Sequence, residues 1–158
     1  MIRGHQFNKI EMFNFTTEDK SWEAFDEMVG YVEKLTEGLG LHYQTSLLAA
    51  GDASSAMAKT VDIEVWIPSM DIYKEVSSAS NALDYQARRG NIRYKPNSTS
   101  SGQAASGNKF VHTLNASGLA TSRLIPAILE QFQQEDGSVL VPEVLQKFVG
   151  KKELRIMN

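Results

Sequence analysis

The chain has 158 residues, of which 42% are hydrophobic and 22% charged, so it suits one globular domain with a sizeable core and is not a disordered chain. The formal net charge of −3 gives no overall basic footprint for nucleic acid, and the lack of cysteine excludes disulfides and thiolate metal sites. The N-terminal MIRGHQF lacks the apolar core of a signal peptide, and no apolar run approaches ~20 residues, so we expect a cytoplasmic protein without membrane contact.

Residues 5–15, HQFNKIEMFNF, predict a strand with an unusual pattern. Its odd positions carry His5, Phe7, Lys9, Glu11, Phe13 and Phe15. A half-buried strand normally separates apolar from polar residues, whereas here charges alternate with aromatics on one face. Because an aromatic ring among charges suits a planar, charged ligand, this face is predicted to line a ligand cavity.

The middle of the chain predicts one helix and several strands. Apolar spacings of three and four over residues 17–38 indicate a helix that ends at Gly38. Residues 42–51, 60–68 and 71–80 predict strands, the last two as an antiparallel hairpin, and 82–95 a helical turn followed by a strand. Arg88, Arg89 and Arg93 are interpreted as a solvated basic turn or a set of ion pairs in preference to a nucleic-acid contact. The Ser/Gly-rich residues 96–108 predict a flexible, exposed loop.

Residues 109–118 predict another strand, on which Thr113, Asn115 and Ser117 share a polar face. In strand 71–80 simple alternation puts Glu75 and Ser77 on one face and Ser78 on the other. If one sheet carries these strands together with the first, its polar face lines a ligand cavity; a solvated sheet face is the alternative. A helix over 119–134, a turn, a short strand and a terminal helix complete an α+β fold.

The segment SGLATSR, residues 117–123, enters this helix through small residues that let a ligand approach the backbone. Arg123 falls near the helix start, where a cation opposes the helix dipole. A phosphate partner would explain it, and a surface arginine is the alternative. Pro126 inside the same segment predicts a later helix start or a kink. His5, His42 and His112 lack metal-ligand spacing.

Three long stretches in this order resemble the C-terminal part of bacterial seryl-tRNA synthetases. They are RGHQFNKIEMF, VDIEVWIPSMDIYKEVSSASNALDYQARRGNIRY and FVHTLNASGLATSRLIPAILEQFQQEDGSVLVPEVL. The resemblance implies the class II synthetase core, an antiparallel sheet flanked by helices. Residues 1–158 would then form a partial catalytic domain, incomplete at its N-terminal side. The implied activity is activation of serine with ATP and Mg²⁺, followed by transfer to serine tRNA.

The resemblance also implies residue roles. Arg3 and Arg123 would be the catalytic arginines at the ATP phosphates, and Phe7 would stack on adenine. Glu11, Asn115 and Ser117 would bind serine. The remaining ATP-binding positions would be Gly4, His5, Gln6, Glu75, Val76, Ser77 and Ser78. Of these, Glu75 and Ser78 would also hold Mg²⁺.

Several parts of the family pattern have no counterpart in this sequence. They are the coiled-coil arm that grips tRNA, the first class II motif, a Thr-x-Glu loop and an Arg-x-Glu strand. We therefore expect a portion of a longer, homodimeric enzyme that is inactive or weakly active alone. The alternative is a non-catalytic, synthetase-like module that binds a nucleotide or an amino acid.

Overall fold

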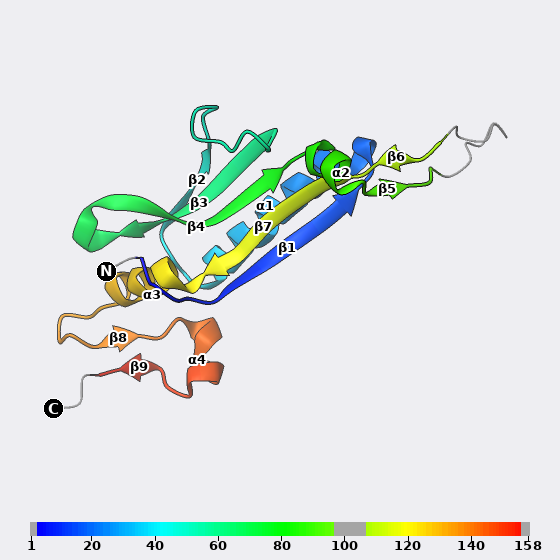
Figure 1. The fold of residues 1–158 in the computed structure, drawn as a ribbon. Helices are drawn as coiled ribbons and strands as arrows, with labels where there is room; N and C mark the ends of the chain where they lie inside the picture. Colours follow the sequence, from blue (N-terminus) through cyan, green and yellow to red (C-terminus); the bar gives the residue numbers. More distant parts are fainter. Residues whose placement is uncertain (1–2, 97–106, 156–158) are drawn as a thin grey trace.

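The fold is an antiparallel sheet with helices behind it and at both of its ends (Figure 1). This computed structural model describes residues 3–96 and 107–155. Most of the loop expected at 96–108, residues 97–106, lies outside the described residues. The five strands lie in the order β1 (Lys9–Thr16), β7 (His112–Ala120), β4 (Ile72–Asn81), β3 (Lys59–Ile67) and β2 (Tyr43–Leu47), each antiparallel to its neighbour.

The helices and smaller elements extend this sheet in chain order. A 3-10 turn, η1 (Glu18–Lys20), leads into α1 (Ser21–Gly38), and η2 (Pro68–Met70) joins β3 to β4. One end carries α2 (Tyr85–Gly90) and the hairpin of β5 (Arg93–Tyr94) and β6 (Lys109–Phe110) (Figure 1). At the other end lie α3 (Thr121–Gln131), β8 (Val139–Leu140), α4 (Glu143–Val149) and β9 (Glu153–Leu154) (Figure 1).

The hydrophobic core lies between α1 and one face of the sheet. Phe25 and Val32 of α1 are buried against Ile63 of β3 and Leu114 of β7. A buried Phe or Leu contributes roughly 1.5–3 kcal/mol to stability, so this face holds α1 in place. The helix ends where the sequence predicts, and Gly40 follows with a φ of 72° that favours glycine.

The opposite face of the sheet is polar across β1, β7, β4 and β3. The register places Glu11 opposite Ser117, Asn115 opposite Ser80, and Asp62 opposite Ser78. One sheet therefore carries all three polar strands, as the sequence analysis required for a cavity-lining face.

Two irregularities in the register lie beside each other on this sheet. β4 has one extra residue at Val76, since Ile63 pairs with Ser77 but Glu64 pairs with Glu75. β7 has one extra residue opposite Ile10, where Leu119 adopts a φ of 70°. The bulge at Val76 places Glu75 on the face of Ser78, so the prediction that Glu75 shares a face with Ser77 was wrong, whereas Ser77 and Ser78 lie on opposite faces as predicted.

The α+β class and the hairpin of β3 and β4 are confirmed. The strand predicted from residue 5 begins only at Lys9, and the helix predicted from 17 begins at Ser21 after a 3-10 turn. Helix α3 starts at Thr121 despite Pro126, so the later start was wrong. Among the residues that the structure describes, no helix combines the length and apolar character needed to cross a membrane.

Candidate functional site

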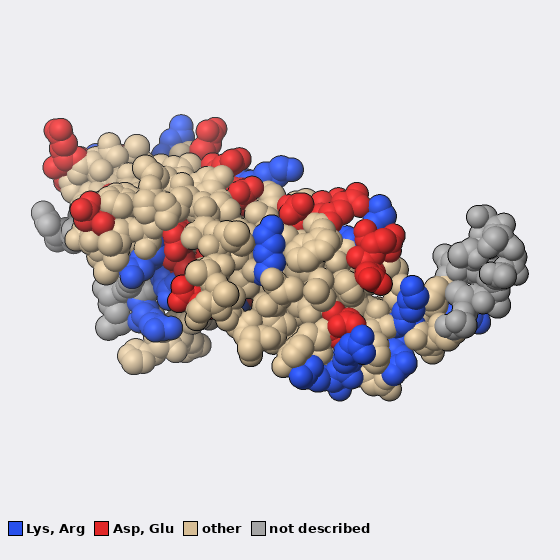
Figure 2. Space-filling view, turned by 90° about the horizontal axis from the view of Figure 1, so that it is seen from above, with Lys and Arg blue, Asp and Glu red and all other residues tan. Residues whose placement is uncertain are grey.

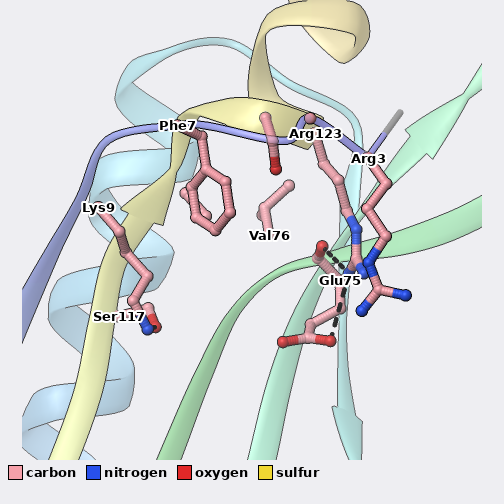
Figure 3. A pocket seen from close by; sticks show the side chains of 10 residues that line it. Arg3, Phe7, Lys9, Glu75, Val76, Ser117 and Arg123 are labelled. Atoms are coloured by element: carbon pink, nitrogen blue, oxygen red, sulfur yellow. Dashed lines mark hydrogen bonds and ion pairs between the residues drawn. The ribbon is translucent and has the colours of Figure 1, made fainter. Parts of the chain in front are cut away.

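A cavity of about 260 Å³ opens where α3 begins, beside both bulges. Its wall is formed by Arg3, Gly4, Phe7, Lys9, Glu75, Val76, Ser117, Ala120, Ser122 and Arg123. These residues come from the segment before β1, from β1, β4 and β7, and from the first turn of α3 (Figure 3). The cavity combines two arginines, one lysine and one carboxylate with a single aromatic ring.

The segment before β1 is anchored to the start of α3. The backbone N–H and the side-chain hydroxyl of Thr121 both donate to the Asn8 carbonyl, at 3.0 and 3.1 Å, and the Asn8 N–H donates to the Thr121 hydroxyl at 3.0 Å. Phe7 immediately precedes this clamp and its ring remains half exposed above the cavity (Figure 3). A rigid, accessible ring of this kind can stack on a planar ligand.

Arg123 and Glu75 join α3 to β4 at the cavity wall. The Arg123 Nη1 donates to the Glu75 carbonyl at 2.7 Å and to Glu75 Oε2 at 3.3 Å. The Arg3 side chain descends next to that of Arg123 from the same side of the cavity (Figure 3). The two guanidinium groups therefore converge on one corner of the cavity, where they can bind an anion of more than one negative charge.

A second group of polar residues surrounds Glu11 beside the cavity. The Lys9 ammonium lies 2.9 Å from Glu11 Oε2 and donates to Ser117 Oγ at 3.1 Å. Ser117 Oγ donates to Glu11 Oε2 at 3.0 Å, and Asn115 Nδ2 donates to Oε1 at 2.9 Å. Burial raises the pKa of Glu11, but the hydrogen bonds from Lys9, Asn115 and Ser117 outweigh it and leave the pKa below its ordinary value.

Asp62 is a buried carboxylate on β3, outside the residues that line the cavity. Its side chain is only 7% exposed, and no described residue hydrogen-bonds to its Oδ1. Burial raises the pKa of Asp62, and the nearby charges of Glu75 and Glu64 act in the same direction. The sequence pattern placed Asp62 on the polar face of its strand, but nothing in the pattern indicated that this face would be covered.

The structure brings together seven of the residues singled out from the sequence. These are Arg3, Gly4, Phe7, Glu75, Val76, Ser117 and Arg123. Glu11 and Asn115 lie directly behind Ser117 through hydrogen bonds. Four other positions lie outside the cavity wall: His5 and Gln6 are exposed, Ser77 is buried with its hydroxyl donating to the Ser117 carbonyl at 2.6 Å, and Ser78 is paired with Asp62 in the sheet.

Lys9, Ala120 and Ser122 also line the cavity, although no ligand role was assigned to them from the sequence. Lys9 could have been recognised as a cavity residue from the alternation of charges and aromatics around it. The small residues of SGLATSR were the signal for Ala120 and Ser122. Asp62 had no such signal, because its burial depends on residues outside its own strand.

Glu75 is the side chain best placed to meet a cation at this cavity. Among the residues described here, its Oε1 takes part in no hydrogen bond or ion pair, and no cluster of three or more His, Asp or Glu forms a metal cage. Magnesium commonly uses one or two carboxylates, substrate phosphates and water. The single free carboxylate oxygen therefore fits Mg²⁺ bound together with a phosphate ligand.

Residues 1–132 match the family described as the tRNA synthetase class II core domain (G, H, P, S and T). The chain is 64% identical over 154 residues to "Serine--tRNA ligase 2" of Clostridium acetobutylicum, covering 98% of this chain and 35% of that protein. It is 47% identical over 154 residues to "Serine--tRNA ligase" of Maridesulfovibrio salexigens, again covering 98% of this chain and 35% of the relative.

Two solved structures that resemble this chain are also serine-tRNA ligases. Seryl-tRNA synthetase from Pyrococcus horikoshii complexed with ATP superposes with a TM-score of 0.90 at 40% identity, over 99% of this chain and 34% of that one. Serine-tRNA ligase from Naegleria fowleri in complex with AMP gives a TM-score of 0.87 at 40% identity, over 99% of this chain and 36% of that one. The chain thus spans about a third of the length of these relatives. From its sequence match and from its sheet and helix arrangement, the chain belongs to the family of class II tRNA synthetase core domains.

Proposed function

We propose that this chain forms part of a serine-tRNA ligase and supplies one side of its site for ATP and serine. The observation that supports this most strongly is the cavity in which Arg3, Phe7, Glu75 and Arg123 meet beside the Glu11 network. A nucleotide needs a stacking surface and cations for its phosphates, and the cavity offers both. The relatives named above are serine-tRNA ligases, and the solved structures hold ATP or AMP.

The proposed reaction has two steps. A serine carboxylate oxygen attacks the α-phosphorus of ATP, and the bond to the pyrophosphate leaving group breaks to give seryl-adenylate. A hydroxyl at the end of serine tRNA then attacks the activated carbonyl, and AMP leaves. Neither step needs a covalent bond to the protein, so the work of the side chains is positioning and charge stabilisation.

The roles of the phosphate-binding residues are proposed from their positions. Phe7 stacks on the adenine ring, and Arg3 and Arg123 neutralise charge on the phosphates, where negative charge builds up as pyrophosphate leaves. Glu75 would hold Mg²⁺ with Ser78 in support, and the bound cation would neutralise phosphate charge. His5, Gln6, Ser77, Gly4 and Val76 are proposed to shape this part of the site around the nucleotide.

The Glu11 network would bind serine. Glu11 is held as a carboxylate and can accept a hydrogen bond from the substrate ammonium or hydroxyl. Lys9 now occupies one Glu11 oxygen, so we propose that it shifts to the substrate carboxylate when serine binds. Asn115 and Ser117 keep the Glu11 carboxylate in place during this exchange. The whole enzyme is proposed to be a cytoplasmic homodimer.

A chimera tests the proposal. Residues 1–158 replace the matching third of the Clostridium acetobutylicum relative, and serine-dependent ATP–pyrophosphate exchange is measured. We expect exchange close to that of the relative, and a loss of roughly 10²–10³-fold on Arg123→Ala, as for other preorganised groups that stabilise transition-state charge. Lys151→Ala, an exposed residue after α4, is the control and should change nothing.

The outcome also separates the two functions considered from the sequence. Exchange that depends on serine and on Arg123 supports the ligase. Binding of ATP or serine without any exchange in the chimera would instead support the non-catalytic module and contradict the proposal.

A further inference from the structure

We propose that the end of the molecule formed by α2 and the β5–β6 hairpin, remote from the cavity, binds the phosphate backbone of RNA. Lys and Arg side chains gather there, as Figure 2 shows. The group, called the basic end below, consists of Arg88, Arg89, Arg93, Lys95 and Lys109, all of them exposed. The chain as a whole carries a net charge of −3, so these five cations form a local basic surface on an acidic protein.

Ion pairing accounts for little of this charge. Arg88 pairs with Asp84 at 2.6 Å on α2. Across residues 3–96 and 107–155, Arg89, Arg93, Lys95 and Lys109 form no ion pair within 4.0 Å. The interpretation of the arginines as a set of ion pairs therefore holds for Arg88 alone. The other four cations repel one another unless water, salt or an anionic partner screens them.

Aromatic rings hold the arginines in fixed orientations. The guanidinium carbons of Arg93 and Arg88 lie 4.1 and 4.9 Å from the ring centre of Phe110, and that of Arg89 lies 3.4 Å from the ring of Tyr85. A guanidinium that is stacked on a ring still presents its N–H groups at its edge, in the geometry that a phosphate accepts. Because these side chains are ordered before a partner arrives, binding would cost them less entropy.

The neighbouring cavity indicates which kind of anion fits. It has a volume of about 320 Å³ and is lined by Glu18, Asp84, Arg88, Tyr94, Lys109, Phe110 and His112. Its two carboxylates disfavour a small anion inside it. The unpaired cations Arg89, Arg93 and Lys95 lie outside this wall, so the surface suits an extended polyanion that contacts several cations in turn.

The choice of RNA rather than an acidic protein rests on the proposed function, which already requires an RNA substrate. The basic end lies far from the ATP cavity, because β7 runs from His112 beside it to Ala120 at the cavity. At roughly 3.3 Å per residue this separates the two by about 26 Å. Contacts at the basic end would therefore hold the body of an RNA without touching the reacting atoms.

The test compares two triple variants of this chain. Arg89→Gln with Lys95→Gln and Lys109→Gln removes three cations of the basic end. Lys34→Gln with Lys151→Gln and Lys152→Gln removes the same charge from exposed positions on α1 and after α4. Binding of a fluorescently labelled 24-base-pair RNA duplex is followed by anisotropy between about 50 and 200 mM salt.

We expect the first variant to reduce the slope of log affinity against log salt by roughly two to three, since each lost phosphate contact removes about one unit. The control variant should keep the slope. The thermal midpoint should change little in either, because the six residues are exposed. An equal loss of slope in both variants would show an effect of overall charge and overturn the proposal.

Poly-glutamate is the second probe. Binding of poly-glutamate as tight as that of RNA, with the same loss in the first variant, would assign the basic end to acidic proteins and overturn the proposal. Exchange activity of the chimera described above is measured separately. If the first variant loses the salt dependence of RNA binding but the same substitutions leave exchange in the chimera unchanged, the basic end is supported as an RNA surface. If the chimera shows no exchange at all, only the proposed ligase function is contradicted.

Discussion

Glu11 has three partners of two kinds, the Lys9 cation and the neutral donors Asn115 and Ser117. Its pKa is below the ordinary value of 4.5, so the folded state favours the carboxylate. This contribution to stability is fully present above about pH 4.5 and is lost as the pH falls through the folded pKa. Glu11→Gln should therefore lower the free energy of unfolding by about 1 kcal/mol at pH 7 and by less below pH 4.

Thermal unfolding of the wild type and Glu11→Gln between about pH 3 and 8 measures this difference. Glu23→Gln is the control, since the Glu23 side chain is exposed and, within the described part of the chain, pairs only with Lys20. A difference that stays constant down to pH 3 would show that Glu11 is not stabilised as a carboxylate. In the chimera, Glu11→Gln should also raise the KM for serine more than the KM for ATP, because a charge-assisted hydrogen bond is lost.

Asp62 should behave in the opposite way. Burial raises its pKa, so the charged form is less stable in the folded than in the unfolded protein. Its unfavourable contribution is absent below the ordinary pKa of 3.8 and develops as the pH rises through the folded pKa. Asp62→Asn should therefore raise the thermal midpoint by a few degrees at pH 7 and have little effect near pH 3. A lower midpoint at pH 7 would show that a partner stabilises the Asp62 carboxylate.

Arg123 contributes to the fold as well as to the cavity. The helix dipole disfavours a cation at this position, but the Glu75 carboxylate and carbonyl oxygens compensate for it. Arg123→Ala should cost about 1 kcal/mol of stability, more than expected for a surface arginine. Arg123→Lys should retain part of the stability but lose much of the ATP affinity, since the planar guanidinium is lost. ATP affinity and the thermal midpoint are measured for the wild type, Arg123→Ala and Arg123→Lys. Equal ATP affinity in these three proteins would make Arg123 purely structural.

At the scale of single elements, α3 contains a proline in its second turn. Pro126 cannot donate to the Ser122 carbonyl, and its ring crowds that carbonyl. Pro126→Ala should raise stability by about 1–2 kcal/mol, less than the full helix penalty because the unfolded chain also gains freedom. Denaturant unfolding measures this, with Leu129→Ala on the same helix as a comparison that removes apolar contacts. A loss of stability in Pro126→Ala would show that the ring is needed for packing.

Strand β1 forms an edge of the sheet and carries exposed apolar residues. Ile10, Phe13 and Phe15 are 73%, 71% and 58% exposed. An exposed, apolar edge strand offers both hydrogen-bonding groups and a hydrophobic surface to another chain. This chain should therefore self-associate at micromolar concentration, and Phe13→Lys should reduce the association.

Sedimentation velocity measures the association. Phe148→Lys is the matched control, since Phe148 is 76% exposed but lies on α4. If both substitutions reduce association equally, general apolar exposure and not the edge of β1 is responsible.

At the scale of the whole molecule, the chain covers about a third of its relatives. The cavity described here contains arginines from one side only, and the relatives contribute further chain that this sequence does not match. We expect the isolated chain to show serine-dependent ATP–pyrophosphate exchange at least 10²-fold slower than the chimera, since the loss of a single stabilising group already costs that much. Exchange within tenfold of the chimera would show that these residues suffice.

The sequence alone determined most of the elements and the family. Alternating residues predicted β3 and β7, because a strand with one buried face shows a period of two, and the short turn after β3 predicted β4 as its hairpin partner. Apolar spacing predicted α1, and its glycine predicted its end. The basic residues of α2 and β5 were recognised, although the stacking of Arg88 and Arg93 on Phe110 depends on contacts of α2 and β5 with β6.

Only the tertiary structure decided which side chains share the cavity. The bulge at Val76 adds one residue to β4, and because side chains alternate with a period of two, this moves Glu75 to the face of Ser78, opposite to the core face of Ser77. Burial of Asp62 likewise follows from its surroundings and not from its own strand pattern. Local periodicity reports the conformation of a segment, whereas bulges and burial depend on neighbours that are distant in the sequence.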